Sequence, residues 1–148
     1  MKTTIISALL LINIWLPACQ AGITADKVPA LVSNSFKVRF AEATEVEWAK
    51  TGNLYEVEFM VQGHEVTALL DASGKILKHK EDILLAALPE GVKNALNQEY
   101  KNYKTDDIEK LDTDGSVYYQ VELENADQEL KQVFTTDGKP TTAIAYWD

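Results

Sequence analysis

The chain has 148 residues, of which 46% are hydrophobic, and a formal net charge of −9. This length suffices for one ordinary domain or two very small ones, and the apolar fraction argues against a disordered chain. Because an acidic protein repels phosphate groups, DNA, RNA and anionic lipid surfaces are poor candidates for partners. A basic protein surface or a cation is compatible with this charge.

Residues 1–21 have the organisation of an export signal. Lys2 provides a positive start, and a mostly apolar run follows from Thr3 to Leu16. Because this run is too short to span a bilayer comfortably as a permanent helix, we expect it to direct export and then to be removed. No later segment is apolar enough to span a membrane, so we expect a mature protein that is soluble or lipid-anchored.

Cys19 is the only cysteine, which excludes an intramolecular disulfide. It ends the segment Leu16-Pro17-Ala18-Cys19, which resembles a bacterial lipobox, although Pro17 is unusual in that motif. In a lipobox the cysteine becomes the lipidated first residue of the mature protein. We therefore expect lipid attachment at Cys19, and ordinary cleavage after Ala21 is the alternative.

The remaining chain contains an internal repeat. Three motifs recur after 60 to 64 residues: Val28-Pro29 as Leu88-Pro89, Tyr55-Glu56-Val57 as Tyr119-Gln120-Val121, and Gly74-Lys75 as Gly138-Lys139. A four-residue insertion near residues 111–115 accounts for the change of offset. We expect a first copy at 26–83 and a second copy at 84–148.

Each copy begins with a helical pattern. Apolar residues recur there at spacings of three and four, namely Val28, Leu31, Val32, Phe36 and Phe40 in the first copy and Leu88, Val92, Ala95, Leu96 and Tyr100 in the second. Pro29 and Pro89 suit the first turn of a helix, where a missing N–H costs nothing. One helix is therefore predicted at the start of each copy.

After each helix the apolar period changes to two, which is typical of strands with one face on a core and one face toward solvent. The residues expected to share one continuous core are Trp48, Tyr55, Val57 and Phe59 with Phe36, and Tyr119, Val121 and Leu123 with Leu96. Glycine-containing turns separate the strands. We expect about four short antiparallel strands after each helix.

These motifs resemble those of a known family. Each copy has a Leu/Val-Pro helix start, an aromatic residue near the helix end, a Tyr-x-Val-x-Phe/Leu strand and a strand that closes in Gly-Lys. The pattern, from Asp26 to Tyr146, resembles the PepSY-like, β-lactamase-inhibitor-protein-like repeat of secreted bacterial proteins. The resemblance implies an α+β tandem repeat, with helices on one face of a curved antiparallel sheet, in the periplasm or cell envelope.

The same resemblance implies a binding role, because the open sheet face of the family's namesake grips an enzyme. The motifs matched here are core and turn positions, so no binding residue is carried over from the family. The namesake also has disulfides, which a chain with one cysteine cannot form.

No constellation in the sequence predicts catalysis or a metal centre. His64 and His79 are the only histidines, and no cysteine stands at ligand spacing from them. Residues 112–115 begin like a calcium loop, but Gln120 and Val121 stand where later acidic ligands are needed, which favours a hairpin turn. We expect no cofactor and no enzymatic activity.

The alternation leaves one sheet face uncommitted to the helices. That face should carry Glu56, Glu58 and Met60 from the first copy and Tyr118, Gln120, Glu122 and Glu124 from the second. Apolar anchors within an acidic rim suit a partner with a basic surface. We expect an exported protein that binds, and inhibits or regulates, another envelope protein. The alternatives are a plain solvated face, and a small-ligand or cation-binding protein that uses its acidic surface.

Overall fold

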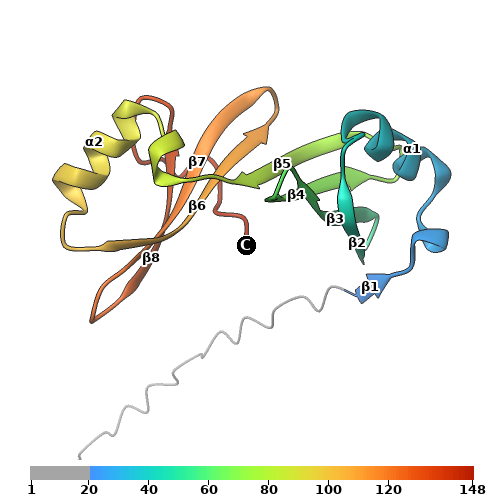
Figure 1. Cartoon of the computed structure of the whole chain (residues 1–148), viewed down its shortest axis with the longest axis horizontal. Coiled ribbons are helices and arrows are strands. Elements are labelled where there is room, and N and C mark those ends of the chain that lie inside the picture. The colour runs from blue at the N-terminus through green and yellow to red at the C-terminus, as the bar shows by residue number, and fades with distance from the viewer. Residues whose placement is uncertain (1–20) are drawn as a thin grey trace, which may run out of the picture.

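The computed structural model describes residues 21–148 (Figure 1). Cys19 and its lipobox-like segment lie outside the described residues. The helices are α1 (Ala30–Arg39) and α2 (Glu90–Glu99), preceded by the short 3-10 helices η1 (Ala25–Lys27) and η2 (Leu85–Ala87). The strands are β1 (Ala21–Ile23), β2 (Thr44–Thr51), β3 (Leu54–Val61), β4 (His64–Asp71), β5 (Ile76–Asp82), β6 (Lys104–Thr113), β7 (Ser116–Glu124) and β8 (Glu129–Thr135). Between residues 21 and 148, no helix has both the length and the apolar character needed to cross a membrane.

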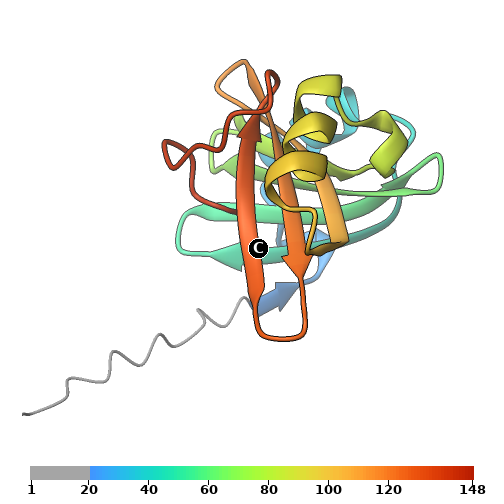
Figure 2. The same ribbon diagram turned by 90° about the vertical axis from the view of Figure 1, so that its left-hand side faces the viewer.

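Within residues 21–148, all eight strands form one antiparallel sheet, in which each strand pairs with the next one along the chain. Figure 1 shows α1 and α2 at opposite ends of this twisted sheet, and Figure 2 looks along the sheet from the α2 end, with α1 behind α2. Both helices cover the same face, because cross-strand partners share a face. One such row connects the strands beneath α1 to those beneath α2 through Val66, Glu81, Lys110 and Tyr119. The expected α+β fold with helices on one face is therefore confirmed.

The residues expected in the core are buried, but they form two separate cores instead of one continuous core. Under α1, the ring of Phe36 packs edge-on against Trp48 and Phe59, with centroid distances of 5.2 and 5.0 Å. Under α2, Leu96 belongs to a second cluster, together with Tyr119, Val121 and Leu123.

Polar residues on the helix-covered face explain why the two cores do not merge. Where β5 meets β6 in the middle of the sheet, His79 pairs with Asp112 and Glu81 pairs with Lys110. Side chains of this kind keep contact with water or with each other, so an apolar cluster cannot continue across them.

The two halves repeat the same backbone hydrogen bonds. The recurring donor and acceptor pairs are Phe40–Phe36 and Tyr100–Leu96 at the helix ends, and Asp71–Lys75 and Thr135–Lys139 in the turns after β4 and β8. Each pair in the first half is separated from its counterpart in the second half by 60 residues at the helix ends and by 64 residues in the turns. Local geometry in the two halves therefore follows the recurring residues.

The second half lacks the fourth strand that the repeat leads one to expect. Pro140 stands where the first half has Ile76, the first residue of β5. Because proline has no N–H to donate to a ladder, only an isolated bridge forms there, between Phe134 and Pro140. The chain after Pro140 instead runs to the opposite face of the sheet, where Trp147 contacts Gln120.

Candidate binding face

All seven residues predicted for partner binding lie on the sheet face turned away from the helices, in one group on β3 and another on β7. Glu58 on β3 and Tyr118 on β7 lie on one row of cross-strand partners, through Thr67, Lys80 and Leu111. The other predicted residues stand at even spacing from these two on the same strands: Glu56, Met60, Gln120, Glu122 and Glu124. We call this surface the open face.

The first half of the open face is acidic. Glu47 and Glu58 are exposed and face each other across β2 and β3, and together with Glu56 they line a shallow hollow of about 200 Å³. Burial, followed by the charges of Glu56 and Glu65, raises the pKa of Glu58 above its usual range. Like charges held this close favour an approaching cation or basic side chain, because such a group relieves their mutual repulsion.

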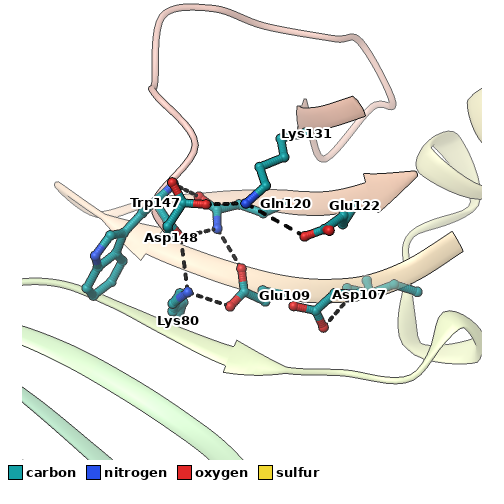
Figure 3. A network of polar contacts seen from close by, with 9 residues as sticks. Lys80, Asp107, Glu109, Gln120, Glu122, Lys131, Trp147 and Asp148 are labelled. Carbon is teal, nitrogen blue, oxygen red and sulfur yellow. Dashed lines mark hydrogen bonds and ion pairs between the residues drawn. The ribbon is translucent and has the colours of Figure 1, made fainter. Parts of the chain in front are cut away.

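A chain segment covers the second half of the open face. Residues 141–148 turn back across β7, and the side-chain amide of Gln120 pairs with the backbone of Trp147 (Figure 3). The Trp147 N–H donates to Gln120 Oε1 over 2.8 Å, and Gln120 Nε2 donates to the Trp147 carbonyl over 3.0 Å. This is the way an amide side chain recognises an extended peptide, through one donor and one acceptor at once.

An ion pair beneath this segment completes the network in Figure 3. Lys80 Nζ lies 2.7 Å from Glu109 Oε1, and Gln120 Nε2 donates to Glu109 Oε2 over 2.6 Å. Lys80 also donates to the Trp147 carbonyl over 3.0 Å. Because each charged group is partnered, the cost of burying this pair is offset, and Lys80 and Glu109 hold Gln120 in position.

The side chains of the C-terminal segment lie on lysines. The Lys78 ammonium is 3.9 Å from the centre of the Trp147 ring, and the Lys131 ammonium is 5.2 Å from that of Tyr146. Lys131 forms an ion pair with Asp148. Burial lowers the pKa of Lys78 and raises the pKa of Tyr146. Cation–π contacts and this ion pair therefore hold the segment in addition to Gln120.

The seven predicted contact residues are not equally accessible. Gln120 is fully buried and Glu56 is only 9% exposed, so neither belongs to a solvated face as expected. Met60, Tyr118, Glu122 and Glu124 are half-buried. Glu122 lies 3.8 Å from Lys131, and Glu124 pairs with Lys104 at 2.9 Å. Only Glu58 of the seven is exposed.

Sequence reasoning missed two members of the network, Lys80 and Glu109, and it placed Trp147 only as an apolar residue opposite the core alternation. The position of Trp147 near the chain end suggests that its ring covers the last strand. In the structure the Trp147 ring instead lies near the middle of the sheet, against Lys78 and Lys80 of β5. One signal was present. Pro140 occupies the repeat position that corresponds to Ile76, the first residue of β5. A proline at this position indicates that the segment after it cannot continue the sheet.

Comparison with known families decides where this chain belongs. The sequence matches the family described as "Putative beta-lactamase-inhibitor-like, PepSY-like" over residues 14–78 and over residues 55–139. The chain belongs to this PepSY-like family. The match includes all the strands and helices of the PepSY-like fold described above, and the resemblance noted in the sequence is confirmed.

Solved structures share this fold. A DUF2874 family protein from Bacteroides uniformis has 20% identity and a TM-score of 0.71, covering 76% of this chain and 85% of that one. A BLIP-like protein from Bacteroides fragilis has 21% identity and a TM-score of 0.69, covering 76% and 82%. A "putative periplasmic" protein from Bacteroides eggerthii has 15% identity and a TM-score of 0.71, covering 76% and 85%. Curated proteins gave no significant match to the sequence.

Proposed function

We propose that this PepSY-like protein is an exported, non-enzymatic binding protein of the cell envelope. It binds another envelope protein on the open face, and this binding inhibits or regulates the partner. The observation that carries the proposal is the division of the open face. One half already holds a polypeptide, the chain's own segment 141–148, while the other half presents uncovered carboxylates.

The uncovered half favours a partner with a basic surface. Glu47, Glu58 and Glu65 are exposed there, and Met60 beside them is half-buried. Burial is the main cause of the raised pKa of Glu58, and the charges of Glu56 and Glu65 add to it. Lysine or arginine side chains of a partner would lower this repulsion between carboxylates. Complementary charge of this kind speeds association and selects the partner, and the methionine supplies an adaptable apolar contact.

The test is capture of proteins from an envelope extract by the folded protein. The triple variant Glu47→Gln, Glu58→Gln, Glu65→Gln should lose a basic partner that the wild type retains. A control triple variant, Asp26→Asn, Glu99→Gln, Asp127→Asn, removes the same charge at other exposed positions and should retain it. Equal capture by all three proteins would show that the acidic half of the open face does not bind the partner. A substrate turned over by the purified protein would overturn the non-enzymatic role.

The alternative, a small-ligand or cation-binding protein that uses its acidic surface, has less support. Across residues 21–148, no three His, Cys, Asp or Glu side chains are arranged so that they could hold a metal ion. Calorimetric titration with calcium separates the two functions. Calcium binding that is abolished by the Glu47, Glu58, Glu65 triple variant would favour the alternative.

We further propose that the protein is exported to the periplasm and anchored there by lipid on Cys19. The apolar run and the lipobox-like segment support this, and a structurally similar protein is described as periplasmic. Metabolic labelling with a fatty acid should mark the wild type and not Cys19→Ala. A wild type without label, whose mature chain starts after Ala21, would show ordinary signal cleavage instead.

We also propose that 26–83 and 84–148 are two copies of one unit. Support comes from the equivalent turns after β4 and β8. In each turn a lysine N–H donates to the side chain of the first turn residue, although that residue is an aspartate in one turn and a threonine in the other. The Lys75 N–H donates to Asp71 Oδ1 over 3.1 Å, and the Lys139 N–H donates to Thr135 Oγ1 over 3.2 Å. Exchanging the turns 71–75 and 135–139 should change the free energy of unfolding by less than about 1 kcal/mol. A protein unfolded by this exchange would contradict equivalence.

A further inference from the structure

A cleft of about 540 Å³ lies under the C-terminal end of α2, on the helix-covered side of the sheet. Leu96 of α2 and Leu123 of β7 line it, and Leu85 of η2, which is 52% exposed, lies at its wall. Tyr100 and Tyr103 add rings with hydroxyl groups. The volume is within the range of pockets that hold small organic ligands.

The first half of the molecule fills the equivalent space with aromatic rings. Under α1, Phe36 stands where α2 has Leu96, and Phe59 stands where β7 has Leu123. Their ring centroids are 5.0 Å apart, and Phe40 lies 4.7 Å from Phe59. Aliphatic side chains at both positions are smaller, so the second half retains a hollow where the first half has a packed cluster.

The charge of the cleft is opposite to that of the whole protein. Two lysines, Lys93 and Lys101, contribute to its lining, and no aspartate or glutamate among the described residues does so. Lys93 also lies 3.1 Å from Glu90, whose side chain is 81% exposed and points to solvent. In a chain with a net charge of −9, such a site favours a ligand that carries its own negative charge.

We propose that this cleft binds an amphipathic organic anion, a single carboxylate on an aliphatic chain. The aliphatic chain packs against Leu85 and the rings of Tyr100 and Tyr103, above a floor formed by the buried Leu96 and Leu123. The carboxylate lies near the ammonium groups of Lys93 and Lys101. Burial of the aliphatic chain supplies most of the affinity, and the lysines select the charge of the head group. This site is separate from the open face, because it lies on the other side of the sheet.

Decanoate is the probe, and decyltrimethylammonium, with the same chain and the opposite charge, is its control. Calorimetric titration should show binding of decanoate and not of the cation, although the protein as a whole attracts cations. Leu96→Phe places in α2 the ring that Phe36 places in α1, and should weaken decanoate binding by about tenfold or more through loss of volume. Its melting temperature should stay level or rise, and Leu123→Phe provides a second filling variant should Leu96→Phe fail to fold.

The contribution of charge is tested separately. Lys101→Gln should weaken decanoate binding about threefold to fivefold, as expected for an exposed ion pair. Lys37→Gln, on the exposed side of α1, should leave it unchanged. Decanoate binding that survives in folded Leu96→Phe and Leu123→Phe would overturn the proposal. So would equal binding of the anion and the cation, or no binding by the wild type at millimolar decanoate.

Discussion

At the scale of single residues, Gly91 and Gly138 show how a missing side chain sets the position of a helix. The turn at Gly138 packs against the start of α2 so closely that a Cβ on Gly138 would clash with the Gly91 carbonyl group. Its φ of 85° is also unfavourable for any other residue. Gly91, which has no evident purpose in the sequence, is required because a Cβ there would lie 2.6 Å from the backbone of Asp137.

Replacing Gly138 should therefore be far more damaging than replacing another glycine with positive φ. Gly138→Ala combines an unfavourable φ with a backbone clash, and should lower the free energy of unfolding by about 3 kcal/mol or more. Gly115 has a φ of 73° but nothing within 4 Å of its Cβ position, so Gly115→Ala should cost about 1 kcal/mol. Urea unfolding measures both values, and equal losses would contradict the close packing of turn and helix.

The charge of Asp82 opposes folding. Burial, followed by the charges of Asp107 and Glu65, raises its pKa from 3.8 to about 6. Between these two pH values the folded protein holds a proton that the unfolded chain has lost. The contribution of Asp82 to stability therefore falls as the pH rises from about 3.8 to about 6, and remains at its lower value above that.

Removing this charge should stabilise the protein at neutral and alkaline pH. Asp82→Asn should raise the free energy of unfolding by about 1 kcal/mol at pH 8, a value reduced from the full shift because the side chain is partly exposed and screened. The gain should shrink below about pH 6 and disappear near pH 3, where the carboxyl is largely protonated in both states. Urea unfolding at the two pH values provides the measurement. A gain of the same size at both would show that the charge of Asp82 is not the cause.

At the scale of elements, the segment 141–148 belongs to no strand and lies on top of the sheet after a single backbone bond, from the Thr141 N–H to the Val133 carbonyl. Its attachment uses side chains instead of a ladder: Gln120 binds the Trp147 backbone at 2.8 and 3.0 Å, and Lys80 adds a third bond. A strand held by a ladder would have a backbone partner at every second residue. The segment is consequently held by a few side chains, among which Gln120 makes two of the three bonds to the Trp147 backbone.

Loss of the Gln120 amide should release this segment while the sheet remains folded. In Gln120→Ala, the backbone groups of Trp147 lose two partners and Glu109 loses one, so amide hydrogen exchange at Trp147 should accelerate about tenfold or more. Glu124→Gln is the control, because Glu124 lies on the same strand and face but pairs with Lys104. Unchanged exchange at Trp147 in Gln120→Ala would mean that the lysine contacts alone hold the segment.

At the scale of the whole molecule, one continuous sheet carries two hydrophobic clusters that remain separate within residues 21–148. The polar pairs of β5 and β6 separate them on the helix-covered face, whereas the backbone ladder continues through the same two strands. Each half therefore has its own hydrophobic cluster between helix and strands, and the backbone ladder of the sheet joins the two halves.

Core substitutions in the two halves should accordingly have additive effects. Phe59→Ala and Leu123→Ala each remove a side chain that is 1% exposed, and should each cost about 2–5 kcal/mol. The double variant should lose the sum of the two within about 0.5 kcal/mol, because the residues share no contact in either cluster. A departure of more than about 1 kcal/mol, measured by urea unfolding, would show that the cores are coupled across β5 and β6.

The sequence by itself determined which side of the sheet each residue occupies. Because side chains alternate strictly along a strand, the apolar positions Tyr55, Val57 and Phe59 are enough to place Glu56 and Glu58 on the other face. The helix starts at Pro29 and Pro89 and the recurring Gly-Lys turns are predictable for a related reason: they depend on neighbours in the chain, and these are visible in the sequence.

Only the tertiary structure decided what lies against each face. Alternation places Gln120 opposite the core, but its complete burial results from Trp147, which is 27 residues away and reaches it only because Pro140 ends the sheet. The polar barrier between the cores likewise depends on the register of β5 with β6, and the cleft under α2 depends on how closely a helix approaches smaller side chains. Such contacts join distant parts of the chain, and the periodicity of one segment carries no information about them.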